Sequence, residues 1–247
     1  MDSPVFMLKY RKQKTIYAET RKDVLRYEFG SVIIIYEQDN RKGYGFCMNK
    51  KLILVAAPPA CGKTFLSLQI AKALPHIVYL DKDDLEALVR ASFSAAGKDV
   101  DMDGIFYKEN IRAAEYETLM HIALSTLRFE DYVLVNAPLS KEVRDITYMQ
   151  NLKAKANECG AQLLLLWVTA PQEICFERMK VRNSERDTLK LLNWEEYVNK
   201  IDYTPPYALE QAKAVDGIMV FDNGNEVSFV HSLKKALNWI KGSIHNS

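Results

Sequence analysis

The segment from Leu52 to Leu74 constrains the fold of this chain more than any other. Leu52 to Ala56 is an apolar run of strand length, and Thr64 to Leu74 has helical periodicity. Between them lies Ala57 to Thr64, APPACGKT, which follows the pattern G-x-x-x-x-G-K-[ST] except at its first residue. A strand that leads through such a loop into a helix directs backbone N–H groups and the helix dipole at an anion. We therefore expect a phosphate-binding loop here.

The residue types of this loop match the parts of a nucleoside triphosphate and its magnesium ion. Gly62 permits close backbone approach, Lys63 can reach the β and γ phosphates, and Thr64 offers its hydroxyl to magnesium. An accidental GKT at a helix start is the alternative, which the flanking strand and helix disfavour. The remaining predicted contacts are Ala57, in place of the first glycine, and Pro58, Pro59, Ala60, Cys61 and Phe65.

Composition excludes several classes of protein. The chain has 247 residues, 48% of them hydrophobic and 26% charged, which suits one α/β domain with an added segment. Its 33 basic and 32 acidic side chains give no strong signal for a nucleic-acid partner. The four cysteines form no C-x-x-C pair, so we expect reduced thiols. We find no leader peptide and no apolar run of membrane length, which predicts a cytoplasmic protein.

The chain divides into two parts by its pattern. Over residues 1–50, β-rich runs at Ser31 to Tyr36 and Tyr44 to Met48 flank a turn-like segment, which predicts a small antiparallel β appendage. It could extend the sheet, shield the edge of the sheet or recognise a protein partner. Over residues 51–247, apolar strands alternate with helices, which predicts a mainly parallel five-stranded sheet covered on both faces, a three-layer α/β sandwich. The strands are expected at Leu52 to Ala56, Ile77 to Leu80, Tyr132 to Val135, Leu163 to Val168 and Ile218 to Phe221.

Acidic residues follow the second of these strands. Asp81 to Asp84 reads DKDD, and the carboxyl end of a parallel strand faces the same crevice as the phosphate loop. A carboxylate there can accept the proton of an attacking hydroxyl while a neighbour supports magnesium through water. The alternative is that Asp83 only caps a helix, in a D-x-x-E pattern with Glu86.

Arginines recur at intervals of four in PQEICFERMKVRNSERD, from Pro171 to Asp187. Arg178, Arg182 and Arg186 would lie along one helical face if the helix continued that far. Guanidinium groups in such a row can neutralise triphosphate oxygens, and Arg182 is the preferred phosphate contact. The alternative is a solvated helix whose arginines pair with Glu173, Glu177 and Glu185.

From about Leu52 to Lys241 the chain resembles the P-loop kinase group of polynucleotide kinase, chloramphenicol phosphotransferase, the zeta toxins and gluconate- or adenylylsulfate-kinase-like enzymes, often collected as an AAA-type ATP-binding family. The resemblance rests on APPACGKT, DKDD, the strand YVLVNAPL and the arginine series. It implies a P-loop NTPase fold with ATP and Mg²⁺. It further implies that Asp83 is the general base, that Arg178, Arg182 and Arg186 belong to a lid over ATP, and that Asn223 contacts adenine. A simple turn at Asp222 to Gly224 is the alternative for Asn223.

Two departures from the group narrow these expectations. Polynucleotide kinases have an arginine where this chain has Glu86, which disfavours a polynucleotide end as acceptor. Asn136 ends the third strand where many P-loop proteins have aspartate, so magnesium is expected to depend on Thr64 and Asp81.

The leading hypothesis is an ATP- and Mg²⁺-dependent kinase that phosphorylates a hydroxyl of a small-molecule or nucleotide-like acceptor, with Asp83, Lys63, Arg178 and Arg182 as catalytic residues. The alternative is an ATP-binding regulatory or scaffold module that presents the appendage to another protein. An oligomeric motor is less favoured, because we find no second acidic motif after the third strand.

Overall fold

The computed structural model describes residues 50–74, 76–184 and 187–242, together with the backbone of four strands nearer the N-terminus. The chain separates into two compact units, Met1–Cys47 and Met48–Ser247, which are described one at a time. In the first unit an antiparallel sheet has the order β1-β2-β3-β4. The predicted run at residues 44–48 and the turn before it lie outside the described residues. The four strands are β1 (Phe6–Leu8), β2 (Ile16–Arg21), β3 (Val24–Phe29) and β4 (Val32–Glu37).

The second unit is built on a parallel sheet of five strands in the order β6-β7-β5-β8-β9. All five strands predicted from the sequence are present, with ends that differ by one or two residues. Their continuous apolar character follows from burial on both faces, which removes the polar alternation of a half-exposed strand. The strands are β5 (Lys50–Ala56), β6 (Ile77–Asp81), β7 (Tyr132–Asn136), β8 (Ala161–Thr169) and β9 (Gly217–Asp222).

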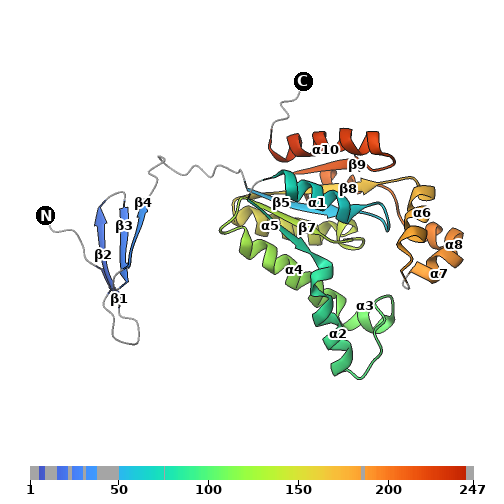
Figure 1. Cartoon of the computed structure of the whole chain (residues 1–247), viewed down its shortest axis with the longest axis horizontal. Coiled ribbons are helices and arrows are strands. Elements are labelled where there is room, and N and C mark those ends of the chain that lie inside the picture. Colours follow the sequence, from blue (N-terminus) through green and yellow to red (C-terminus); the bar gives the residue numbers. More distant parts are fainter. Residues whose placement is uncertain are drawn as a thin grey trace. The chain divides into compact units, whose positions relative to one another are not determined.

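Helices cover both faces of this sheet and complete the predicted three-layer α/β sandwich (Figure 1). Because side chains alternate along β5, Ile53 and Val55 pack against one layer, formed by α1 (Lys63–Ala73) and α10 (Glu226–Ile240). Leu52 and Leu54 face the other layer, which α4 (Arg112–Thr126) and α5 (Ile146–Glu158) form. No helix among the described residues is long and apolar enough to cross a membrane.

A small helical lobe follows β6. The 3₁₀ turn η1 (Lys82–Leu85) leads into α2 (Glu86–Ala95), and α3 (Ile105–Asn110) returns toward α4 (Figure 1). Val89, Phe93, Tyr107 and Ile111 form a core of their own in this lobe, separate from the two cores beside the sheet. The lobe is joined to the rest of the unit through Leu85, which packs against the core beside the sheet, and through the hydrogen bond from Tyr107 to Glu115 of α4.

The arginine-bearing helix is shorter than the sequence predicted. Helix α6 (Gln172–Arg182) ends where Asn183 adopts a left-handed φ of 46°, which stops the helix. The condition for one row of three arginines, a helix that continues to residue 186, is therefore not met, because α6 ends at Arg182. Arg186 itself lies outside the described residues. The chain continues through α7 (Thr188–Leu192), α8 (Trp194–Asn199) and α9 (Ala208–Gln211), and a 3₁₀ turn, η2 (Glu142–Arg144), precedes α5.

Candidate nucleotide and phosphoryl-transfer site

The phosphate loop joins β5 to α1 through two left-handed residues, Ala60 with φ 60° and Gly62 with φ 92°. The N–H of Cys61 donates to the carbonyl of Pro58 at 3.4 Å, which closes a turn before the helix begins. Ala57 has no positive φ, so alanine replaces the first glycine of the pattern without backbone strain. The loop therefore needs glycine at residue 62, where φ is positive, and does not need it at residue 57.

Two side chains hold this loop from the side of α6 and β9. Arg178 donates to the carbonyls of Cys61 at 3.3 Å and Asn223 at 2.9 Å, and the Asn223 amide donates to the same Cys61 carbonyl at 2.7 Å. A Cβ added at Gly62 would lie 2.1 Å from Asn223 Nδ2. Sequence reasoning predicted phosphate and adenine contacts for Arg178 and Asn223, and did not predict that both would bind the loop's carbonyls. In this structure they fix the carbonyl side of the loop.

The amide of Asn136, buried at the end of β7, connects the phosphate loop to β6. Its Oδ1 accepts from Lys63 Nζ at 2.9 Å and from Ser67 Oγ at 3.3 Å. Its Nδ2 donates to Thr64 Oγ1 at 3.1 Å and to Asp81 Oδ2 at 2.6 Å. Three residues singled out from the sequence, the loop lysine, the loop threonine and the first aspartate of DKDD, therefore converge on one side chain.

Tyr79 completes this network and was missed by sequence reasoning. Its hydroxyl donates to Asp81 Oδ2 and lies 3.2 Å from Asn136 Nδ2, whose two N–H groups it shares with Thr64 and Asp81. Burial, followed by the hydrogen bond to Asp81, raises the pKa of Tyr79, so the phenol remains a donor at neutral pH. The sequence contained one sign of this contact. Tyr79 and Asp81 are two residues apart on β6, so their side chains lie on the same face of the sheet.

The donor set around Thr64 and Asp81 fits magnesium. Among the described residues no group of three or more His, Cys, Asp and Glu side chains could hold a metal ion. What this position offers is one hydroxyl and one carboxylate, brought together by a shared hydrogen-bond donor, Asn136. Mg²⁺ in phosphate sites keeps several waters and needs only one or two protein oxygens. The residues therefore suit a hydrated magnesium ion and would not suit a zinc site.

Asp83 lies beside this network on η1. Its carboxylate is exposed and 3.5 Å from Lys82 Nζ, which also binds the buried Glu115 at 2.9 Å. Its backbone N–H donates to Asp81 Oδ1 at 3.0 Å, so Asp81 caps this turn. Helix α2 begins at Glu86 without a side-chain cap, and the alternative that Asp83 caps it is therefore wrong. The Asp83 side chain takes no part in capping.

The predicted phosphate contact Arg182 is paired within its own segment. Its guanidinium donates to Asp187 Oδ2 at 2.8 Å and 2.5 Å, and Asp187 is buried. Of the predicted alternative pairs, Glu177 instead binds Lys180 at 3.1 Å. The structure brings Arg178 to the phosphate loop and holds Arg182 at the C-terminal end of α6.

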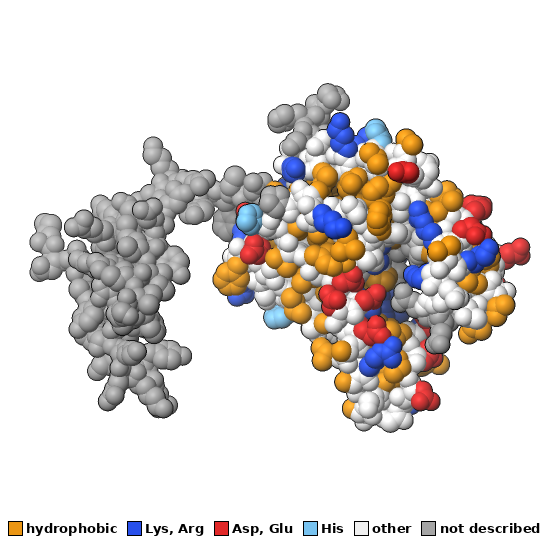
Figure 2. All heavy atoms as spheres, viewed as in Figure 1, with side chains coloured by type: hydrophobic (Ala, Val, Ile, Leu, Met, Phe, Trp, Pro, Cys, Tyr) orange, Lys and Arg blue, Asp and Glu red, His pale blue; other side chains and the backbone are white. Residues whose placement is uncertain are grey.

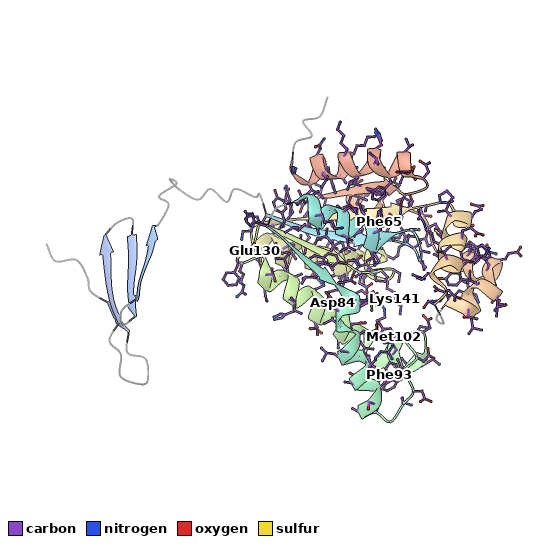
Figure 3. The ribbon with its side chains drawn as sticks, in the orientation of Figure 1. Phe65, Asp84, Phe93, Met102, Glu130 and Lys141 are labelled. Carbon is purple, nitrogen blue, oxygen red and sulfur yellow. The ribbon has the colours of Figure 1, made fainter. Side chains whose placement is uncertain are left out.

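These groups gather at the carboxyl end of the parallel sheet. Figure 3 labels Phe65, Asp84 and Lys141 at this end of the sheet and Glu130 at the other, while Phe93 and Met102 mark the helical lobe. Figure 2 shows the surface hollowed between the sheet and helices α6 to α8, with Lys and Arg side chains at the hollow and acidic ones where α2 begins. Ligands of open parallel sheets bind at this edge, where loops and helix N-termini converge.

The fold and its loop define an α/β P-loop domain of the nucleotide-binding kind. A family model described as an AAA domain matches residues 52–202, and the chain belongs to this family of P-loop kinase-like ATP-binding domains. No curated protein matches the sequence.

Solved structures share the fold at low identity. A kinase candidate from Chloroflexus aurantiacus is 19% identical with a TM-score of 0.51, over 79% of this chain and 96% of its own. A sugar kinase from a Janibacter species is 14% identical with a TM-score of 0.51, over 77% of this chain and 94% of its own. Similarity at this level establishes the α/β P-loop kinase fold and leaves substrates to be argued from the site.

Proposed function

We propose that this protein is an ATP- and Mg²⁺-dependent phosphotransferase that acts on a hydroxyl of a small-molecule or nucleotide-like acceptor. The observation that carries the proposal is the Asn136 network, which joins Lys63, Thr64 and Asp81 at the carboxyl ends of adjacent strands. A lysine for the phosphates and oxygens for magnesium are the parts that phosphoryl transfer requires of a P-loop protein. The exposed carboxylate of Asp83 lies beside them.

Each step of the transfer has a residue in this arrangement. The loop N–H groups and Lys63 bind and orient the triphosphate. Thr64 and, through water, Asp81 would hold magnesium, which would supply positive charge to the phosphate oxygens. Asp83 accepts the proton of the acceptor hydroxyl as that oxygen attacks the γ-phosphorus and ADP leaves. Arg178 keeps the loop carbonyls turned away from the phosphates, because it donates to the carbonyls of Ala60 and Cys61 in the loop and of Asn223 directly after β9.

The test is acceptor-dependent release of ADP. The full chain is incubated with ATP, MgCl₂ and a panel of sugars, polyols and nucleosides, and ADP is measured by a coupled assay. We expect one acceptor class to stimulate turnover, and Lys63→Ala to abolish it while Lys72→Ala, an exposed lysine at the far end of α1, does not. The name of the Janibacter structure makes sugars the first acceptors to try.

A second function, nucleotide-dependent presentation of the N-terminal unit to a protein partner, is favoured by one specific observation. An uncharged amide stands at the end of β7, and it holds Lys63 and Thr64 without supplying a carboxylate. This function requires tight nucleotide binding without acceptor-stimulated turnover. It also requires that Lys63→Ala abolish capture of a partner by the full chain, with Lys72→Ala as control. If an acceptor stimulates the release of ADP in the assay above, the kinase function is supported and this second function is rejected.

A further inference from the structure

Two cysteines meet at the base of the phosphate loop. Cys61 belongs to the loop and Cys175 to α6, and their Sγ atoms lie 3.6 Å apart. Both are free thiols and completely buried. The contact joins positions 114 residues apart in the sequence, so it exists only because the fold docks α6 against the loop. Cys159 also has a free thiol but contacts a carbonyl of α4, Leu124, at 3.6 Å.

A third polar group is close to this pair. The hydroxyl of Tyr203 is buried and has no hydrogen-bond partner among the described residues. A buried hydroxyl without a partner costs free energy, so its presence calls for a polar ligand or a functional use. Burial first, and then the nearby Cys175 and Cys61, raise the pKa of Tyr203 to about 12. Tyr203 packs against the core cluster that contains Cys61 and Cys175, so an unpartnered hydroxyl belongs to the same buried region as the two thiols.

We propose that Cys61 and Cys175 form an oxidation site, in which a small two-electron oxidant of the hydroperoxide class converts the two thiols to a disulfide that ties the phosphate loop to α6. Cys175 loses its proton and its thiolate attacks a peroxide oxygen; the O–O bond breaks, and the leaving oxygen takes up the proton, so that a sulfenic acid and water form from hydrogen peroxide, or a sulfenic acid and an alcohol from an organic hydroperoxide. The sulfur of Cys61 then attacks the sulfenic sulfur, the S–O bond breaks, and water leaves. Two thiols are oxidised and one peroxide is reduced. Because its hydroxyl is buried and has no partner among the described residues, Tyr203 is the donor that we assign to the departing oxygen.

The disulfide would change nucleotide binding through geometry. A disulfide needs its sulfurs about 2.0 Å apart, so the two Sγ atoms, now 3.6 Å apart, must close by more than 1 Å through rotation of the side chains together with a shift of the loop against α6. Cys61 lies between the two left-handed residues of the loop, and its carbonyl accepts from both Arg178 and Asn223. Hydrogen bonds to phosphate tolerate only a few tenths of an ångström. We therefore expect the oxidised protein to bind nucleotide about tenfold more weakly, the equivalent of one lost hydrogen bond.

This inference rests on the nucleotide-binding part of the proposed function and not on phosphoryl transfer. The first measurement requires neither nucleotide binding nor phosphoryl transfer. The folded full chain is titrated with hydrogen peroxide, and the product is identified by intact mass and peptide mapping. We expect loss of two hydrogens, a Cys61–Cys175 cross-link, and full reversal by dithiothreitol. Cys175→Ser must abolish the cross-link, and Cys159→Ser must leave it unchanged. Sulfinic acid without a cross-link, or a cross-link through Cys159, overturns the proposal.

The second measurement is the affinity of a fluorescent ADP analogue for the reduced, oxidised and re-reduced chain. We expect the loss on oxidation to be absent in Cys175→Ser and recovered on reduction. Equal affinities in a chain whose cross-link is mapped would reject the effect on the loop. No binding by the reduced chain would instead contradict the proposed function. Tyr203→Phe should slow cross-linking severalfold without changing the affinity of the reduced chain, and an unchanged rate removes Tyr203 from the reaction.

Discussion

Asn136 Nδ2 lies 2.6 Å from Asp81 Oδ2, so the amide at the end of β7 donates to the carboxylate at the end of β6. The two residues are direct partners in the parallel register of these strands. Because only one of the two side chains can carry a negative charge, the amide and the carboxylate form an attractive pair before any cation binds. A carboxylate at residue 136 would make the same pair repulsive. An aspartate at residue 136 should therefore make the stability of the protein depend on magnesium, which unfolding experiments can measure.

Asn136→Asp should couple stability to magnesium. In EDTA the change removes a donor from Asp81 and places a like charge beside it. The new charge also pairs with Lys63 and offsets part of this cost, so we expect the free energy of unfolding to fall by about 1 kcal/mol. Magnesium bound between the two carboxylates should recover much of this loss. Urea unfolding with and without MgCl₂ measures both effects. Asn136→Ala loses the donor without gaining a charge, and should recover less. An equal response of wild type and Asn136→Asp to magnesium would contradict the assigned metal position.

Gly62→Ala should disturb the phosphate loop for two separable reasons. The left-handed φ of 92° costs an alanine about 1–2 kcal/mol, and the new Cβ would meet Asn223 Nδ2 at 2.1 Å. The double variant with Asn223→Ala removes the steric conflict and keeps the backbone cost. We expect the double variant to be more stable than Gly62→Ala alone and less stable than Asn223→Ala alone, by thermal unfolding. A double variant no better than Gly62→Ala would show that the amide moves aside freely.

Arg182→Ala tests whether this arginine stabilises the fold. Asp187 is 2% exposed and Arg182 is 41% exposed, so removing the arginine leaves a buried carboxylate without its partner. We expect a loss of about 1–3 kcal/mol, below the range for fully buried pairs because Arg182 is partly solvated. Adding Asp187→Asn should recover part of it in urea unfolding. Lys180→Ala, which breaks an exposed pair on the same helix, is the matched control. Unchanged stability with an increased KM for ATP would favour the phosphate contact instead.

Asp83→Asn tests the assigned base. If Asp83 accepts the acceptor proton, acceptor-dependent turnover should fall by about 10²- to 10⁴-fold while affinity for the ADP analogue stays within about twofold. Asp84→Asn, the same change at the next exposed carboxylate on η1, should retain turnover. Turnover retained by Asp83→Asn and lost by Asp84→Asn would move the role to the neighbouring residue.

The five strands and the phosphate loop could be predicted from the sequence because each is encoded locally. Leu52 to Ala56 is apolar at every residue, as a strand buried on both faces must be. Helix α1 starts at Lys63, and the residue directly before it has a left-handed φ, which glycine adopts without strain. This explains why Gly62 precedes Lys63 in the pattern. Both features depend on periodicity and backbone conformation, which neighbouring residues determine.

The helix end at Arg182 was not predictable in the same way. An interval of four between arginines favours one continuous helix, but Asn183 adopts a left-handed conformation and the chain turns so that Asp187 can pair with Arg182. Asparagine tolerates that conformation better than most residues, so the sequence permitted the stop without requiring it.

The partners of the site residues were decided only by tertiary structure. Local pattern identified Lys63, Asp81 and Asn136 separately, yet their common hydrogen bonds follow from β6 and β5 lying on either side of β7. The Cys61–Cys175 contact likewise depends on how α6 docks against the loop. Residue spacing determines which groups are available at the sheet edge. Strand order and helix docking determine which of them meet, because contacts between residues distant in the chain carry no local period.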